Sequence, residues 1–193
     1  QAERDYQLAS GLSQDVETDD SVLRQTSARL PWLLIGMAGG IGSSMILGNF
    51  DNTFAAHPEM ALFIPLIGGT GGNVGTQSSA IVVQGLANSS LDASNTWKQI
   101  LKESVVALIN ATIISMLVYI YNFICFGATA TVTYSVSLSL FAVIMFASIF
   151  GTLVPLTLNK MKIDPAIATG PFITTTNDIL AMVFYMGITA LLA

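Results

Sequence analysis

Long apolar runs separated by short polar connectors dominate this sequence. A helix that crosses a bilayer needs about 20 mostly apolar residues, and five runs meet this length once small interrupting residues are allowed. They cover residues 31–50, 60–87, 105–125, 136–158 and 165–193. The pattern therefore predicts an all-α membrane protein with five transmembrane helices per chain.

Two of the five runs contain residues that weaken a helix. The second run includes PLIGGTGGNVGTQ at 65–77, and the fifth contains Gly170 and Pro171. Loosened backbone at membrane depth is tolerated where it is buried in protein or lines water, and paired broken segments point to an ion site near the midplane. We therefore expect the second and fifth helices to be interrupted. The alternative, dense packing through GxxxG spacings, explains the glycines but not the Asn, Thr and Gln among them.

The basic residues all fall on one side of this five-span arrangement. They are Arg4, Arg24, Arg29, Lys98, Lys102, Lys160 and Lys162. Because Lys and Arg concentrate in cytoplasmic loops, we expect a multi-pass protein of the cell inner (plasma) membrane, surrounded by lipid, with a cytoplasmic amino terminus and an outside carboxyl terminus. Residues 1–29 are polar and are expected to form a cytoplasmic linker, whereas residues 30–193 are expected to form the transmembrane domain.

The composition supports a membrane setting and excludes several kinds of site. The 193 residues are 52% hydrophobic and 10% charged, whereas soluble domains carry about a quarter charged residues. Half of the acidic residues lie within the first 20 positions, so the net charge of -5 belongs mainly to this tail and a nucleic-acid partner is not expected. With one cysteine and one histidine, a Cys/His metal cluster is excluded. A bound metal must have oxygen ligands.

Asp178 is the acid that lies well inside a predicted span, whereas the others, Glu103 included, lie in connectors or near the ends of runs. Moving a carboxylate into hydrocarbon costs on the order of 3 kcal/mol by insertion scales, so such a residue marks a functional site by default. No Lys, Arg or His within the spans can neutralise it. Asp178 is therefore protonated, hydrated in a cavity or paired with a cation. Thr174 and Thr175 precede it by four and three positions and share its face of a helix.

Oxygen ligands of this kind favour particular ions. Carboxylate, amide and hydroxyl oxygens suit Mg²⁺, Ca²⁺ or Mn²⁺. Mg²⁺ gives up water reluctantly and keeps most of its hydration shell when one or two carboxylates hold it. A two-fold homodimer would bring two copies of Asp178 together, and two carboxylates match one divalent charge.

Three motifs resemble the membrane domain of the MgtE family of magnesium channels. They are RLPWLL at 29–34, PLIGGTGGNVGTQSSAIVVQGLA at 65–87 and DPAIATGPFITTTNDILAMVFY at 164–185. The resemblance covers residues 21–193 and implies a homodimeric Mg²⁺ channel with its pore at the dimer interface. Family members commonly carry a cytoplasmic acidic domain and a pair of CBS domains before the membrane part. Residues 1–29 resemble the end of such a region, with a plug-like linker that helps to close the pore.

The resemblance also assigns roles to individual residues. The ion-recognising acid of the family, in its last helix, corresponds to Asp178. The polar residues of its second-helix pore segment correspond to Asn73, Thr76 and Gln77. The predicted pore lining further includes Gly72, Gly170 and Asn177.

The resulting hypothesis is a channel that conducts hydrated Mg²⁺ into the cytoplasm down its electrochemical gradient, with Mn²⁺ or Ca²⁺ as alternative cargoes. Asp178 binds the ion, and oxygens of Asn73, Thr174 and Thr175 orient its water shell. The external mouth is predicted to include Asp51 and Glu59.

Three other functions compete with this hypothesis. The nearest is a proton- or sodium-coupled divalent cation transporter that uses Asp178 as a protonatable relay, and another is a purely structural membrane subunit. An enzyme is not expected, because an intramembrane aspartyl protease needs two acids at membrane depth. A serine protease needs a histidine beside its nucleophile, and His57 lies in an external connector.

Overall fold

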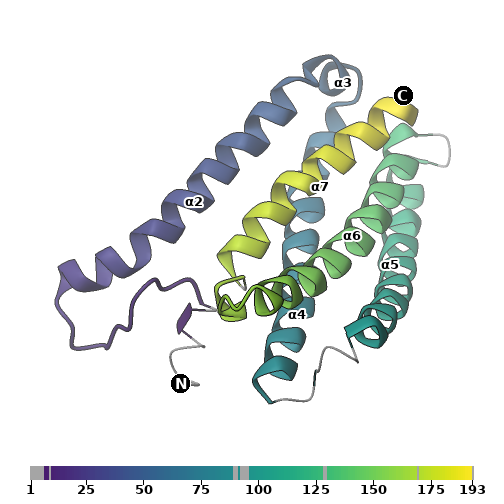
Figure 1. The fold of residues 1–193 in the computed structure, drawn as a ribbon. Coiled ribbons are helices and arrows are strands. Elements are labelled where there is room, and N and C mark those ends of the chain that lie inside the picture. Colours follow the sequence, from purple (N-terminus) through teal and green to yellow (C-terminus); the bar gives the residue numbers. More distant parts are fainter. Residues whose placement is uncertain are drawn as a thin grey trace.

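The chain folds into a bundle of helices. The computed structural model describes residues 7–8, 10–88, 91, 96–127, 130–168 and 170–192, and every regular element in these ranges is helical (Figure 1). In chain order the elements are α2 (Val22–Gly48), α3 (Asp51–Ala56), the 3-10 helix η1 (Pro58–Phe63), α4 (Ile64–Ala87), α5 (Thr96–Phe126), α6 (Thr131–Lys160), the 3-10 helix η2 (Pro165–Ala168) and α7 (Pro171–Leu192). The predicted all-α architecture is confirmed. Arg4, which entered the topology prediction, lies outside the described residues.

Four helices in the described part of the chain are long and apolar enough to cross a membrane. They are α2, α5, α6 and α7. The 24 residues of α4 correspond to roughly 36 Å of helix, which is enough length to cross a bilayer. Its glycines, hydroxyls and amides make it less apolar than the other four, and it packs against both α6 and α7. That α4 is the second of five spans stays a prediction.

The glycine-rich stretch does not interrupt its helix. α4 runs unbroken and has Pro65 in its first turn, where a missing N–H is tolerated because it has no helical partner there. The predicted interruption of the second helix is therefore wrong. In the fifth run, Gly170 has a φ of 60° and lies between η2 and α7, which is unbroken from Pro171 onward. Gly170 and Pro171 thus mark the start of α7.

Glycines let α4 approach its two neighbours closely, which is the physical reason that they do not act as a break. A Cβ at Gly151 of α6 would collide with the carbonyl oxygen of Gly75, and a Cβ at Gly71 would lie 2.8 Å from Cγ1 of Val143. A Cβ at Gly75 would collide with the side-chain amide of Asn177 on α7. Helix interfaces in lipid rely on such small residues because they allow close van der Waals packing.

The apolar core lies where α4, α6 and α7 meet. Its fully buried side chains include Ile67, Val136, Leu140, Ile144 and Met186. The buried hydroxyl of Tyr185 donates a hydrogen bond of 2.7 Å to the carbonyl oxygen of Met60. This bond ties α7 to η1.

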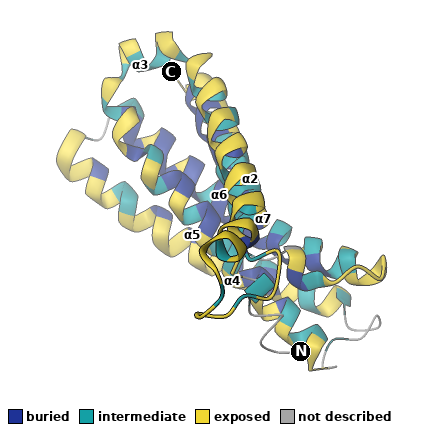
Figure 2. Cartoon of the chain, turned by 90° about the vertical axis from the view of Figure 1, so that its left-hand side faces the viewer, coloured by how far each residue is buried: buried dark blue, intermediate teal, exposed yellow. Residues whose placement is uncertain are grey.

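α2 lies at the edge of the bundle. It packs mainly against α7, and Figure 1 shows it standing apart from α4, α5 and α6. Of its residues, Ala28 and Gly39 are buried, and most of the remainder is exposed (Figure 2). A Cβ at Gly39 would collide with the side chain of Thr175, so α2 and α7 touch at this level.

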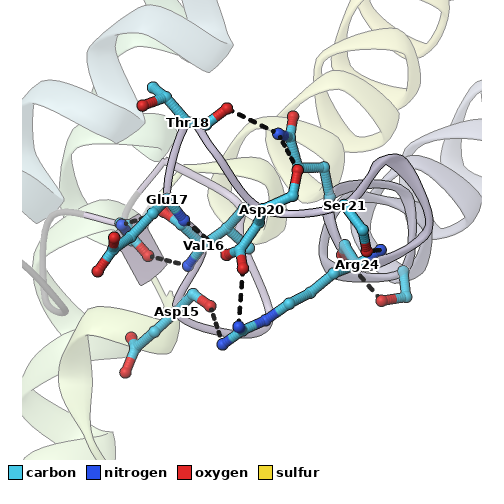
Figure 3. A network of polar contacts seen from close by, with 10 residues as sticks. Asp15, Val16, Glu17, Thr18, Asp20, Ser21 and Arg24 are labelled. Atoms are coloured by element: carbon cyan, nitrogen blue, oxygen red, sulfur yellow. Dashed lines mark hydrogen bonds and ion pairs between the residues drawn. The ribbon is translucent and has the colours of Figure 1, made fainter.

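A polar turn precedes α2 (Figure 3). The guanidinium of Arg24 donates hydrogen bonds of 2.8 Å to Oδ1 of Asp20 and 3.3 Å to the carbonyl oxygen of Asp15. Farther toward the amino terminus, Gly11 has a φ of 85° and lies against the ring of Pro171. The segment before α2 therefore returns to the start of α7.

Candidate ion-binding site

A cavity of about 450 Å³ lies between α2, α4 and α7. It exists because α2 packs on α7 and leaves the facing side of α4 uncovered. Its walls are mostly glycine, serine and threonine, with one carboxylate. The lining residues include Gly36, Gly39, Gly40, Ser43 and Ser44 from α2, Gly68, Gly72 and Asn73 from α4, and Thr174, Thr175 and Asp178 from α7.

The carboxylate of Asp178 faces the bare backbone of α4. A Cβ at Gly72 would lie 3.3 Å from Oδ1 of Asp178, and one at Gly68 would lie 3.8 Å away. Asp178 is half-buried, and within the described ranges no hydrogen bond or ion pair reaches its carboxylate. An acid in this setting can attract a cation, because none of the described residues competes for its oxygens.

A second cavity of about 810 Å³ meets the first at Asp178. Its walls include Gly170 and Pro171 from the start of α7, Arg29 and Trp32 from α2, and Ser10, Gly11 and Leu12 from the segment before α2. Thr174, Thr175 and Asp178 line both cavities. Asp178 therefore lies at the junction between a space bounded by α4 and a space bounded by the amino-terminal segment.

Two threonine hydroxyls join α4 to α7 beside this junction. Oγ1 of Thr76 lies 3.3 Å from Oγ1 of Thr174, and either hydroxyl can donate this bond. The hydroxyl that does not donate to the other threonine can donate to a backbone carbonyl of its own helix or of the residue before it. Thr76 Oγ1 lies 2.9 Å from the carbonyl oxygen of Gly72, and Thr174 Oγ1 lies 3.1 Å from that of Gly170. The pair thus connects α4 with α7 next to the cavity.

Most of the residues predicted for the ion site are brought together by the fold. Asp178, Thr174, Thr175, Asn73 and Gly72 line the first cavity, and Gly170 lines the second. Thr76 touches the site through its bond to Thr174.

Two predicted pore-lining residues lie elsewhere. Asn177 is 1% exposed and packs against Gly75 on the side of α7 turned away from the cavity, because adjacent residues of a helix point about 100° apart. Asn177 therefore lines neither cavity, and its pore-lining role stays a prediction. Gln77 is exposed on α4 and lines neither cavity.

The acids predicted at the external mouth lie outside both cavities. Asp51 is exposed in the first turn of α3, and Glu59 is partly exposed in η1. Oε1 of Glu59 lies 3.5 Å from Nδ1 of His57. In the part of the chain that the structure describes, no three His, Cys, Asp or Glu side chains come together as metal ligands. A site centred on Asp178 therefore offers a single carboxylate per chain.

One buried acid was missed by the sequence interpretation. Glu103 was assigned to a connector, but it lies on α5 and is 7% exposed. The hydroxyls of Ser78 on α4 and Ser148 on α6 each donate a hydrogen bond of 2.6 Å to its Oε1. A signal was present in the sequence: Glu103 begins a series of small or polar residues at every fourth position, Ala107, Ala111 and Ser115, all of which are buried.

Comparison with known proteins gives one consistent result. The model of the MgtE family, described as a divalent cation transporter, matches residues 64–188. The chain is 34% identical over 188 residues to the magnesium transporter MgtE of Bacillus subtilis (strain 168), and these residues make up 97% of the chain and 42% of that relative.

Two further magnesium transporters named MgtE are similar. The one from Enterococcus faecalis is 30% identical over 191 residues, which make up 99% of the chain and 42% of the relative. The one from Thermus thermophilus is 30% identical over 165 residues, which make up 86% of the chain and 36% of the relative. The chain thus spans less than half the length of the curated relatives it matches.

Proposed function

Because the chain belongs to the MgtE family of divalent cation transporters, we propose that it forms a channel for Mg²⁺ in which Asp178 is the ion-recognising carboxylate. The channel conducts hydrated Mg²⁺ into the cytoplasm. The family description is one of transport, and it gives no support to the enzyme alternatives.

The observation that carries this proposal is the carboxylate of Asp178 at the junction of two cavities, where no described residue forms a hydrogen bond or ion pair with it. One carboxylate cannot replace the water shell of Mg²⁺, which holds its waters strongly and is usually bound through one or two carboxylates. The cavity of about 450 Å³ that Gly68, Gly72 and Asp178 line offers space for those waters beside the carboxylate. The geometry therefore favours a hydrated ion over a dehydrated one.

Neutral oxygens around the carboxylate would orient the hydration shell. Asn73 lines the first cavity together with Asp178, and Thr174 and Thr175 line both cavities. None of these groups carries charge, so they can accept or donate hydrogen bonds to metal-bound water without adding a second anion. The inside-negative membrane potential then draws a divalent ion inward by roughly 4.6 kcal/mol per 100 mV, and no coupled energy source is required.

A second copy of the chain would complete the pore. The cavity beside Asp178 is lined on α2 by small residues such as Gly40 and Ser44, which are exposed in the single chain. A two-fold arrangement that places these surfaces together would bring two Asp178 carboxylates to one ion. The proposal therefore includes a homodimer in the cell membrane, with a cytoplasmic amino terminus and with CBS-type regulatory domains as candidate upstream partners.

The transport proposal is tested with the chain reconstituted in liposomes that contain a fluorescent Mg²⁺ indicator. Asp178→Asn keeps the shape of the side chain and removes its charge, and it should lower the initial rate of Mg²⁺ entry at least about tenfold, because interactions with charged groups are worth 1.5 kcal/mol or more. Glu17→Gln makes the same chemical change at an exposed acid before α2 and should leave the rate unchanged. Equal rates for Asp178→Asn and the parent chain would refute the assignment.

The same liposomes separate a channel from a coupled transporter. A proton-coupled transporter that uses Asp178 as a relay requires Mg²⁺ entry to respond to an imposed pH gradient at constant membrane potential. The channel proposal predicts that entry follows the potential alone.

A further inference from the structure

Glu103 is a buried acid that the proposed ion path does not use. Its Oε1 receives hydrogen bonds of 2.6 Å from the hydroxyls of Ser78 on α4 and Ser148 on α6, and the two serine oxygens lie 3.0 Å apart. Bonds of this length are typical of a hydroxyl that donates to a carboxylate. One carboxylate oxygen thus joins α4, α5 and α6.

No basic side chain shares this site in the described part of the chain. α4 contains no charged residue, and the single charged residue of α6 is Lys160 in its last turn. On α5 itself, Lys98 and Lys102 are exposed. Among the described residues, the hydrogen bonds to the carboxylate come from the two serines, and a buried acid held in this way depends strongly on them.

The bond to Ser78 links α5 to the helix that forms the glycine wall of the ion cavity. α5 packs along α6 and has little other contact with α4. Ser78 follows Thr76 by two positions, which places the two side chains about 200° apart around α4. Thr76 is bonded to Thr174 of α7 on the cavity side. α4 is consequently held on opposite sides, by Thr174 on one and by Glu103 on the other.

We propose that Glu103 is a positioning residue for the ion site. Through its hydrogen bond with Ser78, on the side of α4 away from the cavity, it fixes the rotation of α4 that places Gly72 opposite Asp178. This inference deepens the proposed function and rests on it. Glu103 touches neither cavity, so it acts through α4 and not on the ion. Its bond to Ser148 joins α5 to α6, and we expect this bond to matter less for the rotation of α4, although the Ser148 hydroxyl also lies 3.0 Å from that of Ser78.

The two serines provide a matched pair of tests, because each donates the same bond to the same oxygen. Ser78→Ala releases α4 and keeps the tie between α5 and α6, whereas Ser148→Ala keeps α4 in place. In liposomes containing the full chain, Ser78→Ala should raise the half-saturating Mg²⁺ concentration about tenfold. This is the change in affinity that corresponds to the loss of one hydrogen bond to a charged group. Ser148→Ala should leave it within about twofold of the parent value, even where both variants lose similar thermal stability.

A second measurement does not depend on transport. Thr76→Cys with Thr174→Cys, in a background where the exposed Cys125 is replaced by serine, reports the alignment of α4 with α7 through the rate of disulfide formation. Adding Ser78→Ala should slow this reaction severalfold, and adding Ser148→Ala should not. Glu103→Gln retains an acceptor oxygen for Ser78 and should preserve more of the rate than Glu103→Ala does.

The outcomes separate the inference from the transport proposal. If the parent chain carries no Mg²⁺, the proposed function fails, and the disulfide rates still decide whether Glu103 positions α4. If the parent carries Mg²⁺ but Ser78→Ala and Ser148→Ala behave alike in both measurements, Glu103 only joins helices and the inference is overturned.

Discussion

Gly72 on α4 stands directly opposite Asp178 on α7, and a Cβ added at Gly72 would lie 3.3 Å from Oδ1 of that carboxylate. The same Cβ would lie 3.1 Å from Cγ2 of Thr174. Both distances are tighter than ordinary van der Waals contacts. The absence of a side chain at Gly72 therefore keeps open the space in which we propose that a hydrated ion binds.

Gly72→Ala is expected to reduce Mg²⁺ entry about tenfold, because the added methyl group occupies space needed by the water shell in front of Asp178. The measurement is the initial rate of Mg²⁺ entry into liposomes across a range of concentrations. Gly187→Ala is the matched control, since a Cβ there meets nothing within 4 Å. A Gly72→Ala chain with the parent rate would show that the ion passes elsewhere.

Gly151→Ala is expected to destabilise the bundle without a direct effect on ion recognition. The new Cβ would collide with the carbonyl oxygen of Gly75 and lie 3.1 Å from its Cα, and backbone cannot move aside as a flexible side chain can. Overpacking of this kind costs about 1–3 kcal/mol. Thermal unfolding in detergent should show a lower midpoint, whereas Gly48→Ala, with open space around the Cβ, should not lower it.

The hydroxyls of Thr76 and Thr174 are expected to act as a coupled pair. Replacing either threonine by valine removes one hydroxyl of the 3.3 Å contact, and replacing both should cost little more than replacing one. A double-mutant cycle on the apparent affinity for Mg²⁺ should give a coupling energy of about 0.5–1.5 kcal/mol. Strictly additive effects would mean that the two side chains act independently.

Asp51 and Glu59 are expected to raise the entry rate by attracting cations to the external mouth. Because Asp51 is exposed and Glu59 is partly exposed, their effect should be screened by salt, with a Debye length of about 10 Å at 0.1 M. The Asp51→Asn, Glu59→Gln double variant should therefore slow Mg²⁺ entry at low ionic strength and match the parent at high ionic strength. A deficit that persists in high salt would indicate a structural role instead.

The centre of the candidate site could be predicted from the sequence because its residues follow local rules. Thr174 and Thr175 precede Asp178 by four and three positions, and helical periodicity alone places both threonines on the same face as the acid. An acid without a basic neighbour in an apolar run then indicates a functional group. The second side of the cavity, with Gly72 and Asn73, was predicted from residues that are unusual for a membrane span.

Other features depended on tertiary contacts that no local pattern encodes. Whether a glycine run breaks a helix or packs it depends on the neighbour, and here Gly151 of α6 lies against Gly75. Asn177 differs from Asp178 by one position, so the exact rotation of α7 decides which of the two faces the cavity. Glu103 receives its hydrogen bonds from residues 25 and 45 positions away, which a sequence window does not connect.

Gly170 has a left-handed backbone and lies directly before α7, the helix that carries the carboxylate that we propose binds the ion. Asp178 lies eight positions beyond it along an unbroken helix, an arm of roughly 12 Å. A change of about 10° at this one residue would swing the carboxylate by about 2 Å, which is comparable to the distance between Mg²⁺ and a directly bound oxygen. The orientation of α7 at its first residue, where Gly11 of the amino-terminal segment lies against Pro171, therefore bears on where the carboxylate of Asp178 lies.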